Sequence, residues 1–341
     1  MTDNDIQCAG ISDSYAIVSA FDYERYDHLM DVLSDVIAVM RTGEPRSARV
    51  QWHAPWGQRF MPVQGAAGFQ VILQGSCWLI PADGRPVALG VGDVVFLPHG
   101  RGHALADSLS TPLAEPACDP QNDSRFEQRY NSPPVGLVRQ DGAATVTLCG
   151  AYQLDPARAH PLLSDLPEII HLPASPGHRP ELRAAVDLLG GELVSPRPAD
   201  AVMRALLDML LLYILRAWFA DQPDRGPATG WTAALNDPAI SAALHSVHRD
   251  PSHPWTVETL GAQAGLSRAA FSRRFTALVG QPPLTYLTWW RMTTAARLLF
   301  DSDAPLSTIA QQIGYTSEFA FATAFKRQYG TAPGKYRNQT R

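Results

Sequence analysis

The C-terminal part of the sequence, between Trp255 and Arg337, contains two copies of one short pattern. The residues that recur at an offset of 49 or 50 are Leu260, Ala264, Gly265, Ser267, Phe271 and Phe275 in the first copy, and Ile309, Ile313, Gly314, Ser317, Phe321 and Phe325 in the second. Each copy predicts a short helix, a turn that carries Gly and then Ser, and a second helix with apolar residues four positions apart. This order of elements predicts two helix-turn-helix units in one domain.

Charge is distributed unevenly along the chain. From Leu235 onward there are 11 Lys and Arg against 6 Asp and Glu, whereas the preceding residues have 17 against 27. A basic C-terminal domain on an acidic body indicates that only the C-terminal domain contacts a polyanion, and double-stranded DNA is the polyanion that helix-turn-helix units bind.

The second helix of each copy is predicted to begin after a capping serine, Ser267 or Ser317. Because its phenylalanines face the core, the side chains between them face outward. These candidate DNA-binding residues are Arg268, Ala269, Ser272, Arg273, Arg274, Glu318, Ala320, Thr323, Lys326 and Arg327. The N-terminal half of a recognition helix reads base edges, so Ala269, Ser272 and Arg273 are predicted to contact bases.

Arg273 is predicted to bind a guanine through two hydrogen bonds. Arg274, Lys326 and Arg327 are assigned mostly to phosphates, and Glu318 makes the start of the second reading helix less basic. The segment of residues 283–300 between the copies predicts a helix of about 27 Å, close to one turn of DNA at about 34 Å. The alternative is a helical bundle with an incidentally basic face, which two aligned copies disfavour.

Residues 47–173 show a different pattern, with short β-rich runs separated by Gly, Pro and Asp. The runs are FQVIL, CWLIP, PVALG, DVVFLP, TVTLCGAYQL and EIIHLP. Regular short strands with turn signals between them predict a sandwich or a barrel. Residues 106–142 break this rhythm and are expected to form a long surface loop.

Helical stripes flank the β-rich region at residues 27–40 and from Glu181 to Leu189. The stripe from Ala201 to Ala220 is apolar on nearly every face of its centre, so we expect it to pair two copies of the chain in a homodimer; burial inside one monomer is the alternative. The domains expected are a tail (1–20), a β-rich domain (21–175), a helical dimerisation segment (176–222), a linker (223–234) and a DNA-binding domain (235–341).

Candidate ligand-binding residues in the β-rich domain are Trp52, His53, Phe69, Trp78, His99 and His103. No cofactor is expected. A metal held by His99 and His103, with His53 as a third ligand, is the less favoured alternative, because such sites need three or four ligands. Cys118 lies in the predicted loop and is the best candidate for an accessible thiol, whereas Cys77 and Cys149 lie in apolar strand patterns typical of buried cysteines.

The N-terminal residues are polar and acidic, so no signal peptide is expected. The longest apolar run, from Met209 to Leu215, is far shorter than the roughly 20 residues of a membrane span. With four cysteines and no CxxC spacing, these features predict a cytoplasmic protein with reduced thiols and no membrane contact.

The C-terminal hundred residues resemble the DNA-binding domain of the AraC/XylS family of bacterial regulators. The matching segments are AQAGLS at 262–267, RMTTAARLL at 291–299, IGYTSEFAFATAFKRQYG at 313–330, and the closing motif with Gly330, Pro333 and Tyr336. The N-terminal half resembles the cupin-type sensing domain of one branch of this family, through LQGSCWL, GDVVFLPHGRGHAL and LCGAYQL.

The resemblance implies a cupin-like jelly-roll barrel with flanking helices, joined to an all-helical domain with two helix-turn-helix motifs. It implies a non-enzymatic transcriptional activator that responds to a small molecule or an oxidant and works with RNA polymerase on promoter DNA. The first cupin motif, expected near residues 69–75, lacks the His and Glu ligands that metal-binding cupins carry. Cys149 matches a cysteine that some redox-sensing members use. A metal-dependent cupin enzyme fused to a DNA-binding domain and a cysteine-based redox regulator are the alternatives.

Overall fold

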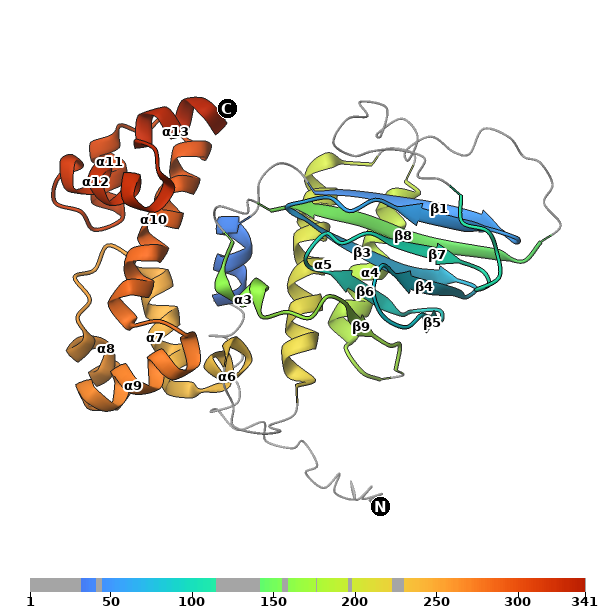
Figure 1. Cartoon of the computed structure of the whole chain (residues 1–341), viewed down its shortest axis with the longest axis horizontal. Helices are drawn as coiled ribbons and strands as arrows, with labels where there is room; N and C mark the ends of the chain where they lie inside the picture. Colours follow the sequence, from blue (N-terminus) through green and yellow to red (C-terminus); the bar gives the residue numbers. More distant parts are fainter. Residues whose placement is uncertain are drawn as a thin grey trace, which may run out of the picture.

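The computed structural model describes residues 32–40, 45–114, 142–154, 159–175, 177–195, 198–222 and 230–340. A β-rich N-terminal half and an all-helical C-terminal half lie side by side (Figure 1). The predicted architecture, a sheet-rich domain with flanking helices followed by a helical domain with two helix-turn-helix units, is confirmed. The predicted tail of residues 1–20 and the first residues of the predicted helix at 27–40 lie outside the described residues.

The strands of the described residues form two antiparallel sheets. They are β1 Arg46–His53, β2 Gly57–Phe60, β3 Ala66–Gln74, β4 Cys77–Pro81, β5 Val87–Leu89, β6 Val94–Leu97, β7 His103–Ala106, β8 Ala144–Gln153 and β9 Ile170–Leu172. One sheet has the order β1-β8-β3-β6-β9 and the other β2-β7-β4-β5. The pairs β1 with β8, β2 with β7, β3 with β6 and β4 with β5 correspond to one long hairpin rolled up on itself, which is a jelly roll.

The central strands β3 and β6 of the five-stranded sheet are buried on both faces. Successive side chains of a strand point to opposite sides, so each strand contributes to two cores. On β3, Phe69 and Val71 pack against helices, whereas Ile72 faces the second sheet. On β6, Val95 and Leu97 join Ile72 in the core between the sheets. Two apolar faces explain why these strands appear in the sequence as continuous apolar runs.

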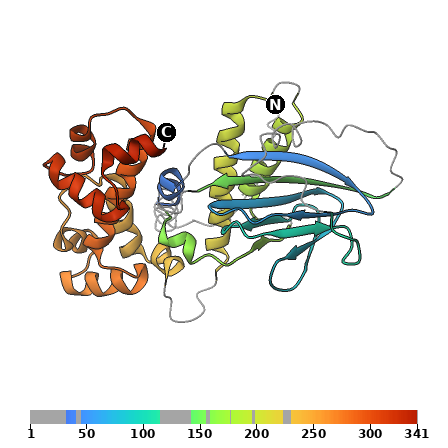
Figure 2. The same ribbon diagram turned by 45° about the horizontal axis from the view of Figure 1, so that its top comes forward.

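Three helices share a core with the outer face of this sheet. They are the helix of residues 32–40, α4 Pro180–Leu193 and α5 Asp200–Ala220; the short α3 Pro161–Ser164 precedes β9. Figures 1 and 2 show the helix of residues 32–40 between α5 and the C-terminal domain. Its apolar residues join a core that continues into the C-terminal domain, because both neighbours offer apolar surface.

The C-terminal half consists of α6 Trp231–Asn236, α7 Pro238–Arg249, α8 Val257–Gln263, α9 Arg268–Val279, α10 Pro283–Asp301, α11 Leu306–Gln312, α12 Glu318–Tyr329 and α13 Pro333–Thr340. Residues 223–229 of the predicted linker lie outside the described residues, and its last part belongs to α6. Pro and Gly suggested a linker up to residue 234, yet Trp231 is 2% exposed and Ala234 fully buried. The end of the predicted linker therefore lies in a helix whose side chains are packed.

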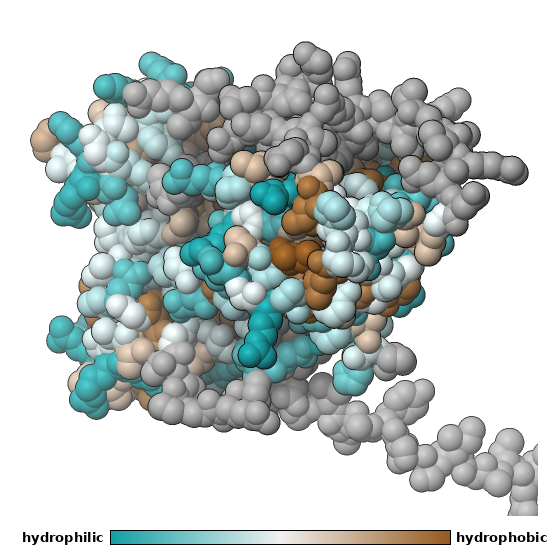
Figure 3. Space-filling view, turned by 45° about the vertical axis from the view of Figure 1, so that its right-hand side comes forward, coloured by the Kyte–Doolittle hydropathy of each residue, from teal (hydrophilic) through white to brown (hydrophobic). Residues whose placement is uncertain are grey.

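The face drawn in Figure 3 is mostly polar, and a group of apolar side chains gathers near its centre. Among the helices of the described ranges, none has the length and apolar character needed to cross a membrane.

Candidate functional site

The first helix-turn-helix consists of α8 and α9. Thr256 and Thr259 form a capping box that starts α8, and the Ser267 hydroxyl accepts a hydrogen bond from the Ala270 N–H at 3.4 Å to start α9. Phe271 and Phe275 of α9 are fully buried, as the repeat predicted. The opposite face of α9 is therefore turned to solvent.

On that face, Arg268, Ala269 and Arg273 are exposed and Ser272 is half-buried. Arg268 Nε lies 3.0 Å from the Glu258 carboxylate of α8, an exposed ion pair that links the two helices of the unit. Arg273 is exposed at the position where the N-terminal half of a recognition helix meets base edges. Its predicted role in base reading remains a prediction.

Arg274 has a contact that the sequence did not suggest. Its guanidinium lies 2.5 Å from the carboxylate of Asp237, which is 8% exposed and also caps α7 through the N–H groups of Ala239 and Ile240. This ion pair ties α9 to α7 within the domain. The predicted phosphate contact of Arg274 would require the pair with Asp237 to open.

The second unit, α11 and α12, repeats this geometry. Ser317 accepts a hydrogen bond from the Ala320 N–H at 3.0 Å, and Phe321 and Phe325 are fully buried. The exposed side chains of α12 include the predicted Glu318, Ala320, Thr323, Lys326 and Arg327. They also include Phe319, 83% exposed, which sequence reasoning missed. The offset of 50 residues, which matches it to Ala269, is the signal that identifies it.

The helix α10 joins the two units and contributes to both cores. Tyr286 and Leu287, near its start, pack in the first core, and Leu299, near its end, packs in the second. At its middle, Arg291 donates to the backbone carbonyls of Pro251 at 2.6 Å and His253 at 2.9 Å. The two units therefore lie at the two ends of one helix of 19 residues, as the sequence predicted (Figure 1).

Gly265 and Gly314 occupy equivalent positions in the turns of the two helix-turn-helix units, so substitutions at these two positions can be compared directly. Gly314→Ala is expected to lower the free energy of unfolding by about 3 kcal/mol and Gly265→Ala by about 1 kcal/mol. Both glycines have left-handed φ angles, +81° and +66°. A Cβ at Gly314 would lie 2.6 Å from the Ser252 carbonyl oxygen, whereas Gly265 faces open space. Urea unfolding followed by circular dichroism measures both losses. Equal losses of unfolding free energy would show that the close approach of a Cβ at position 314 to the Ser252 carbonyl oxygen does not contribute.

A chain of buried polar groups joins the two domains. His160, just before α3, accepts a hydrogen bond on Nδ1 from the Leu162 N–H at 3.0 Å, so its proton lies on Nε2. That Nε2 donates to the Tyr286 hydroxyl at 3.0 Å, and the hydroxyl donates to Nε2 of His248 at 2.5 Å. His248 Nδ1 therefore carries a proton, and it lies 3.7 Å from the carboxylate of Asp35 in the helix of residues 32–40.

Aromatic rings surround this chain. His160 meets Trp231 and Trp289 edge-on, and His248 stacks on Trp290 with ring centroids 3.7 Å apart. Burial lowers the pKa of His160 to about 3. Burial, followed by the charges of His160 and His245, also lowers the pKa of His248 well below its usual value. Both imidazoles are therefore neutral at pH 7, which is the state that the hydrogen-bonded chain requires.

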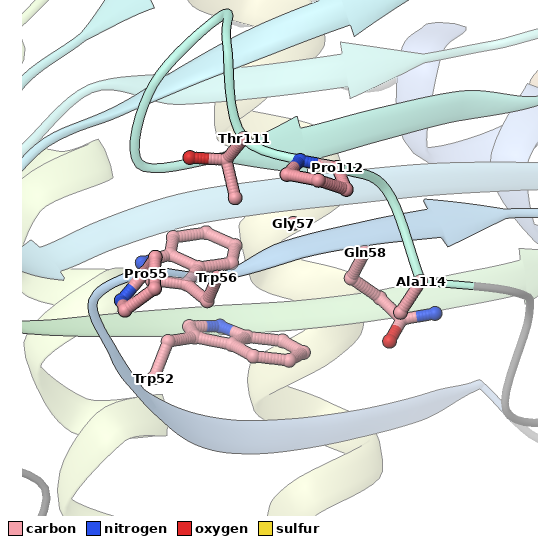
Figure 4. Close-up of a pocket in the computed structure, with 8 residues that line it drawn as sticks. All are labelled: Trp52, Pro55, Trp56, Gly57, Gln58, Thr111, Pro112 and Ala114. Atoms are coloured by element: carbon pink, nitrogen blue, oxygen red, sulfur yellow. The ribbon is translucent and has the colours of Figure 1, made fainter.

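A pocket of about 360 Å³ opens at one end of the jelly roll (Figure 4). Trp52 and Trp56 stack beside it, with ring centroids 4.8 Å apart. Trp52 Nε1 donates to Thr147 at 3.0 Å, whereas the buried N–H of Trp56 has no partner among the described residues. The remaining lining residues are Pro55, Gly57, Gln58, Thr111, Pro112 and Ala114.

Of the predicted ligand-binding residues, the structure brings only Trp52 to this pocket. Phe69 faces the helices and packs on Tyr152, and Trp78 lies half-buried on β4. The other three predicted ligand-binding residues, His53, His99 and His103, do not line this pocket. The predicted residues fall on different faces because strand alternation sends neighbouring positions to opposite sides. Residues 111–114 also line the pocket, but they follow β7 outside the regular strands, so the strand pattern of the sequence could not place them there.

The three histidines proposed as metal ligands have separate partners. His99 Nε2 lies 2.9 Å from the Leu166 carbonyl oxygen, His53 Nε2 lies 3.2 Å from the Gln51 amide, and His103 Nε2 lies 3.2 Å from the Gln70 amide. Burial lowers the pKa of His103 to about 4. Within the described ranges, no group of three His, Cys, Asp or Glu side chains is placed to hold a metal ion.

Cys77 and Cys149 are buried, 3% and 7% exposed. Burial, with a smaller contribution from the charge of Asp93, raises the pKa of the Cys77 thiol to about 12. A thiol of such high pKa is protonated at pH 7 and is a poor nucleophile. Cys118 lies outside the described residues.

A jelly-roll domain joined to two helix-turn-helix units with exposed recognition faces defines a DNA-binding transcriptional regulator. The family described as Cupin matches residues 31–220, and the family described as Helix-turn-helix domain matches residues 260–339. The chain belongs to the AraC-type transcriptional regulators with an N-terminal cupin domain.

Two relatives that match this chain over nearly their whole length support this assignment. A putative AraC-like transcription regulator of Streptomyces antibioticus is 35% identical over 90% of this chain and 98% of its own length. The HTH-type transcriptional regulator AlkR of Acinetobacter baylyi is 30% identical over 91% of this chain and 100% of its own. The DNA-binding domain of AdpA, solved in complex with a target DNA, is 36% identical and covers 30% of this chain and 92% of its own, with a TM-score of 0.29.

Proposed function

We propose that this regulator binds promoter DNA as a homodimer, with α9 and α12 in successive major grooves, and that its cupin domain receives a chemical signal that controls transcription. The observation that carries this proposal is the pair of exposed recognition faces at the two ends of α10. Its 19 residues span about 28 Å, close to the 34 Å of one DNA turn.

Two substitutions separate base reading from phosphate binding. Arg273→Ala is expected to change the sequence preference, with a loss of about 1–3 kcal/mol on the preferred site. Lys326→Ala is expected to weaken binding to all sequences similarly and to reduce the salt slope by about 1. Gel-shift titrations of the full-length chain at several salt concentrations measure both effects.

Arg183→Ala is the matched control, because Arg183 is an exposed arginine of α4 in the other domain and pairs with Asp187 at 3.6 Å. It should leave DNA affinity unchanged. An equal loss on every sequence for Arg273→Ala would remove Arg273 from the base-reading residues.

The signal enters, in this proposal, at the pocket beside Trp52 and Trp56. Two stacked indoles and two prolines suit a small, flat and largely apolar molecule. The signal then reaches the DNA-binding domain across the contact formed by His160, Tyr286 and His248, where the two domains share buried polar groups. Mass spectrometry of small molecules that purify with the chain, compared with the Trp52→Ala variant, tests this entry point.

The dimer surface that we propose lies on α4 and α5. Leu188 and Val202 are 56% and 44% exposed, and Val194, just after α4, is 60% exposed. Exposed apolar side chains on adjacent helices favour a second copy as their partner. Within one chain, however, the centre of α5 is largely buried by its own neighbours, so the pairing involves the ends rather than the centre of this helix. Sedimentation of the full-length chain over a range of concentrations measures the pairing.

The same proposal places the protein in the cytoplasm, where promoter DNA and RNA polymerase are present, and makes it an activator with no catalytic role. The resemblance to AraC/XylS regulators supports activation. In vitro transcription with bacterial RNA polymerase tests it: transcript yield should rise with the regulator, and a fall would show a repressor.

A further inference from the structure

Phe319 is the second residue of α12 and is 83% exposed. The other exposed large hydrophobic side chains of the described residues are at most 60% exposed. An aromatic ring held in water at the start of a recognition helix loses the stabilisation that burial would give it, so a bound partner that covers the ring would gain that contribution.

The internal repeat places Phe319 at a base-reading position. An offset of 50 matches Ser317 to Ser267 and Phe319 to Ala269. Both recognition helices are 12 residues long, each begins after its capping serine, and both second residues are exposed. Whatever contact Ala269 makes in one major groove, Phe319 is positioned to make in the other, with a much larger side chain.

The chemistry around Phe319 favours DNA over a protein as the partner. One turn later, the Thr323 hydroxyl donates to the Phe319 carbonyl at 2.9 Å, so its proton is not available to a base. With Ala320, these residues make the reading end of α12 apolar apart from the exposed Glu318 carboxylate, which can accept a hydrogen bond from a cytosine amino group. The last turn carries Lys326 and Arg327, both exposed, where they suit phosphates on either side of a groove.

The methyl group of thymine is the apolar group that the major groove presents, and phenylalanine is one of the side chains that contact it. We propose that Phe319 reads a thymine by packing its ring against the C5 methyl group, so that the second helix-turn-helix selects sequence by apolar contact. This inference rests on the proposed entry of α12 into the major groove.

The test removes the methyl group from the DNA. A duplex selected from a random pool by the full-length wild-type chain is prepared with each thymine replaced in turn by deoxyuridine. Wild-type affinity is expected to fall about fourfold at one or two positions, the effect of one buried methyl group. Phe319→Ala is expected to bind the thymine duplex at least fourfold more weakly and to show no further loss with deoxyuridine at those positions.

Phe319→Leu keeps an apolar side chain and should retain part of the sensitivity to deoxyuridine. Leu284→Ala, at an exposed leucine of α10, is the control and should keep the full sensitivity. Circular dichroism spectra of all variants check that α12 still folds.

For the variant, unchanged affinity of Phe319→Ala or equal deoxyuridine effects in wild type and Phe319→Ala would overturn the inference. Unchanged affinity together with a loss of transcription would show a protein partner at this ring. If the wild type selects no sequence at all, the proposed DNA-reading function fails with it. Sequence-selective binding without any deoxyuridine effect overturns this inference alone.

Discussion

Tyr286→Phe is expected to lower the free energy of unfolding by about 2–6 kcal/mol, although it removes a single oxygen atom. That oxygen lies between Nε2 of His160 and Nε2 of His248, and all three side chains are at most 6% exposed. Without it, one buried donor and one buried acceptor lose their partners, and each costs about 1–3 kcal/mol. Urea unfolding measured by tryptophan fluorescence reports the change directly, since Trp231, Trp289 and Trp290 surround the site.

Tyr152→Phe is the matched control. Tyr152 is fully buried and its hydroxyl donates to the Leu207 carbonyl at 2.7 Å, inside the N-terminal domain. Because the Tyr152 hydroxyl bonds a single backbone carbonyl in the N-terminal domain, Tyr152→Phe should lower the free energy of unfolding less and should leave the coupling between domains intact. A Tyr286→Phe loss no greater than that of Tyr152→Phe would mean that the interdomain chain contributes little.

Lowering the pH from 6.5 towards 4 is expected to destabilise the protein by up to about 4 kcal/mol per pH unit, enough to unfold a typical domain near pH 5. Burial lowers the pKa of His103 to about 4 and of His160 to about 3, and lowers that of His248 as well. An unfolded histidine has a pKa of about 6.5, so below this pH the unfolded chain binds more protons than the folded one. Stability is therefore full above pH 6.5, and each histidine contributes about 1.4 kcal/mol per pH unit to the loss.

The contribution of one histidine can be measured by comparing the slope of unfolding free energy against pH between the wild type and a variant. His103→Gln should reduce the slope of unfolding free energy against pH by about one third between pH 6.5 and 5, because one of three proton-linked groups is removed. An unchanged slope in His103→Gln would show that His103 is protonated in the folded state over this range.

Much of the fold followed from patterns that neighbouring residues define. The repeat predicted both helix-turn-helix units and their capping serines, because capping and helical periodicity depend on residues three or four positions apart. The strands of the jelly roll followed from apolar runs between turns, and α4 followed from Leu182, Ala185, Val186 and Leu189, which are all buried.

The candidate sites were less predictable where they depend on residues far apart. The pocket takes Trp52 from β1 and Thr111 from the segment after β7, and strand alternation sends Phe69 away from it. Arg274 was assigned to phosphate because an exposed arginine on a recognition helix suggests it, whereas Asp237, 37 residues away, holds its guanidinium. Phe319 was overlooked because its exposure contradicts its hydropathy.

By itself the sequence determined the two recognition helices, their spacing along the chain and the β-rich character of the domain before them, since these follow from local periodicity and from short motifs. Only the tertiary structure decided how the domains meet. His160, Tyr286, His248 and Asp35 come from four separate segments, and their alignment depends on the packing of the helix of residues 32–40 between the domains. Buried polar groups must satisfy one another wherever the chain brings them, and no local pattern specifies that pairing.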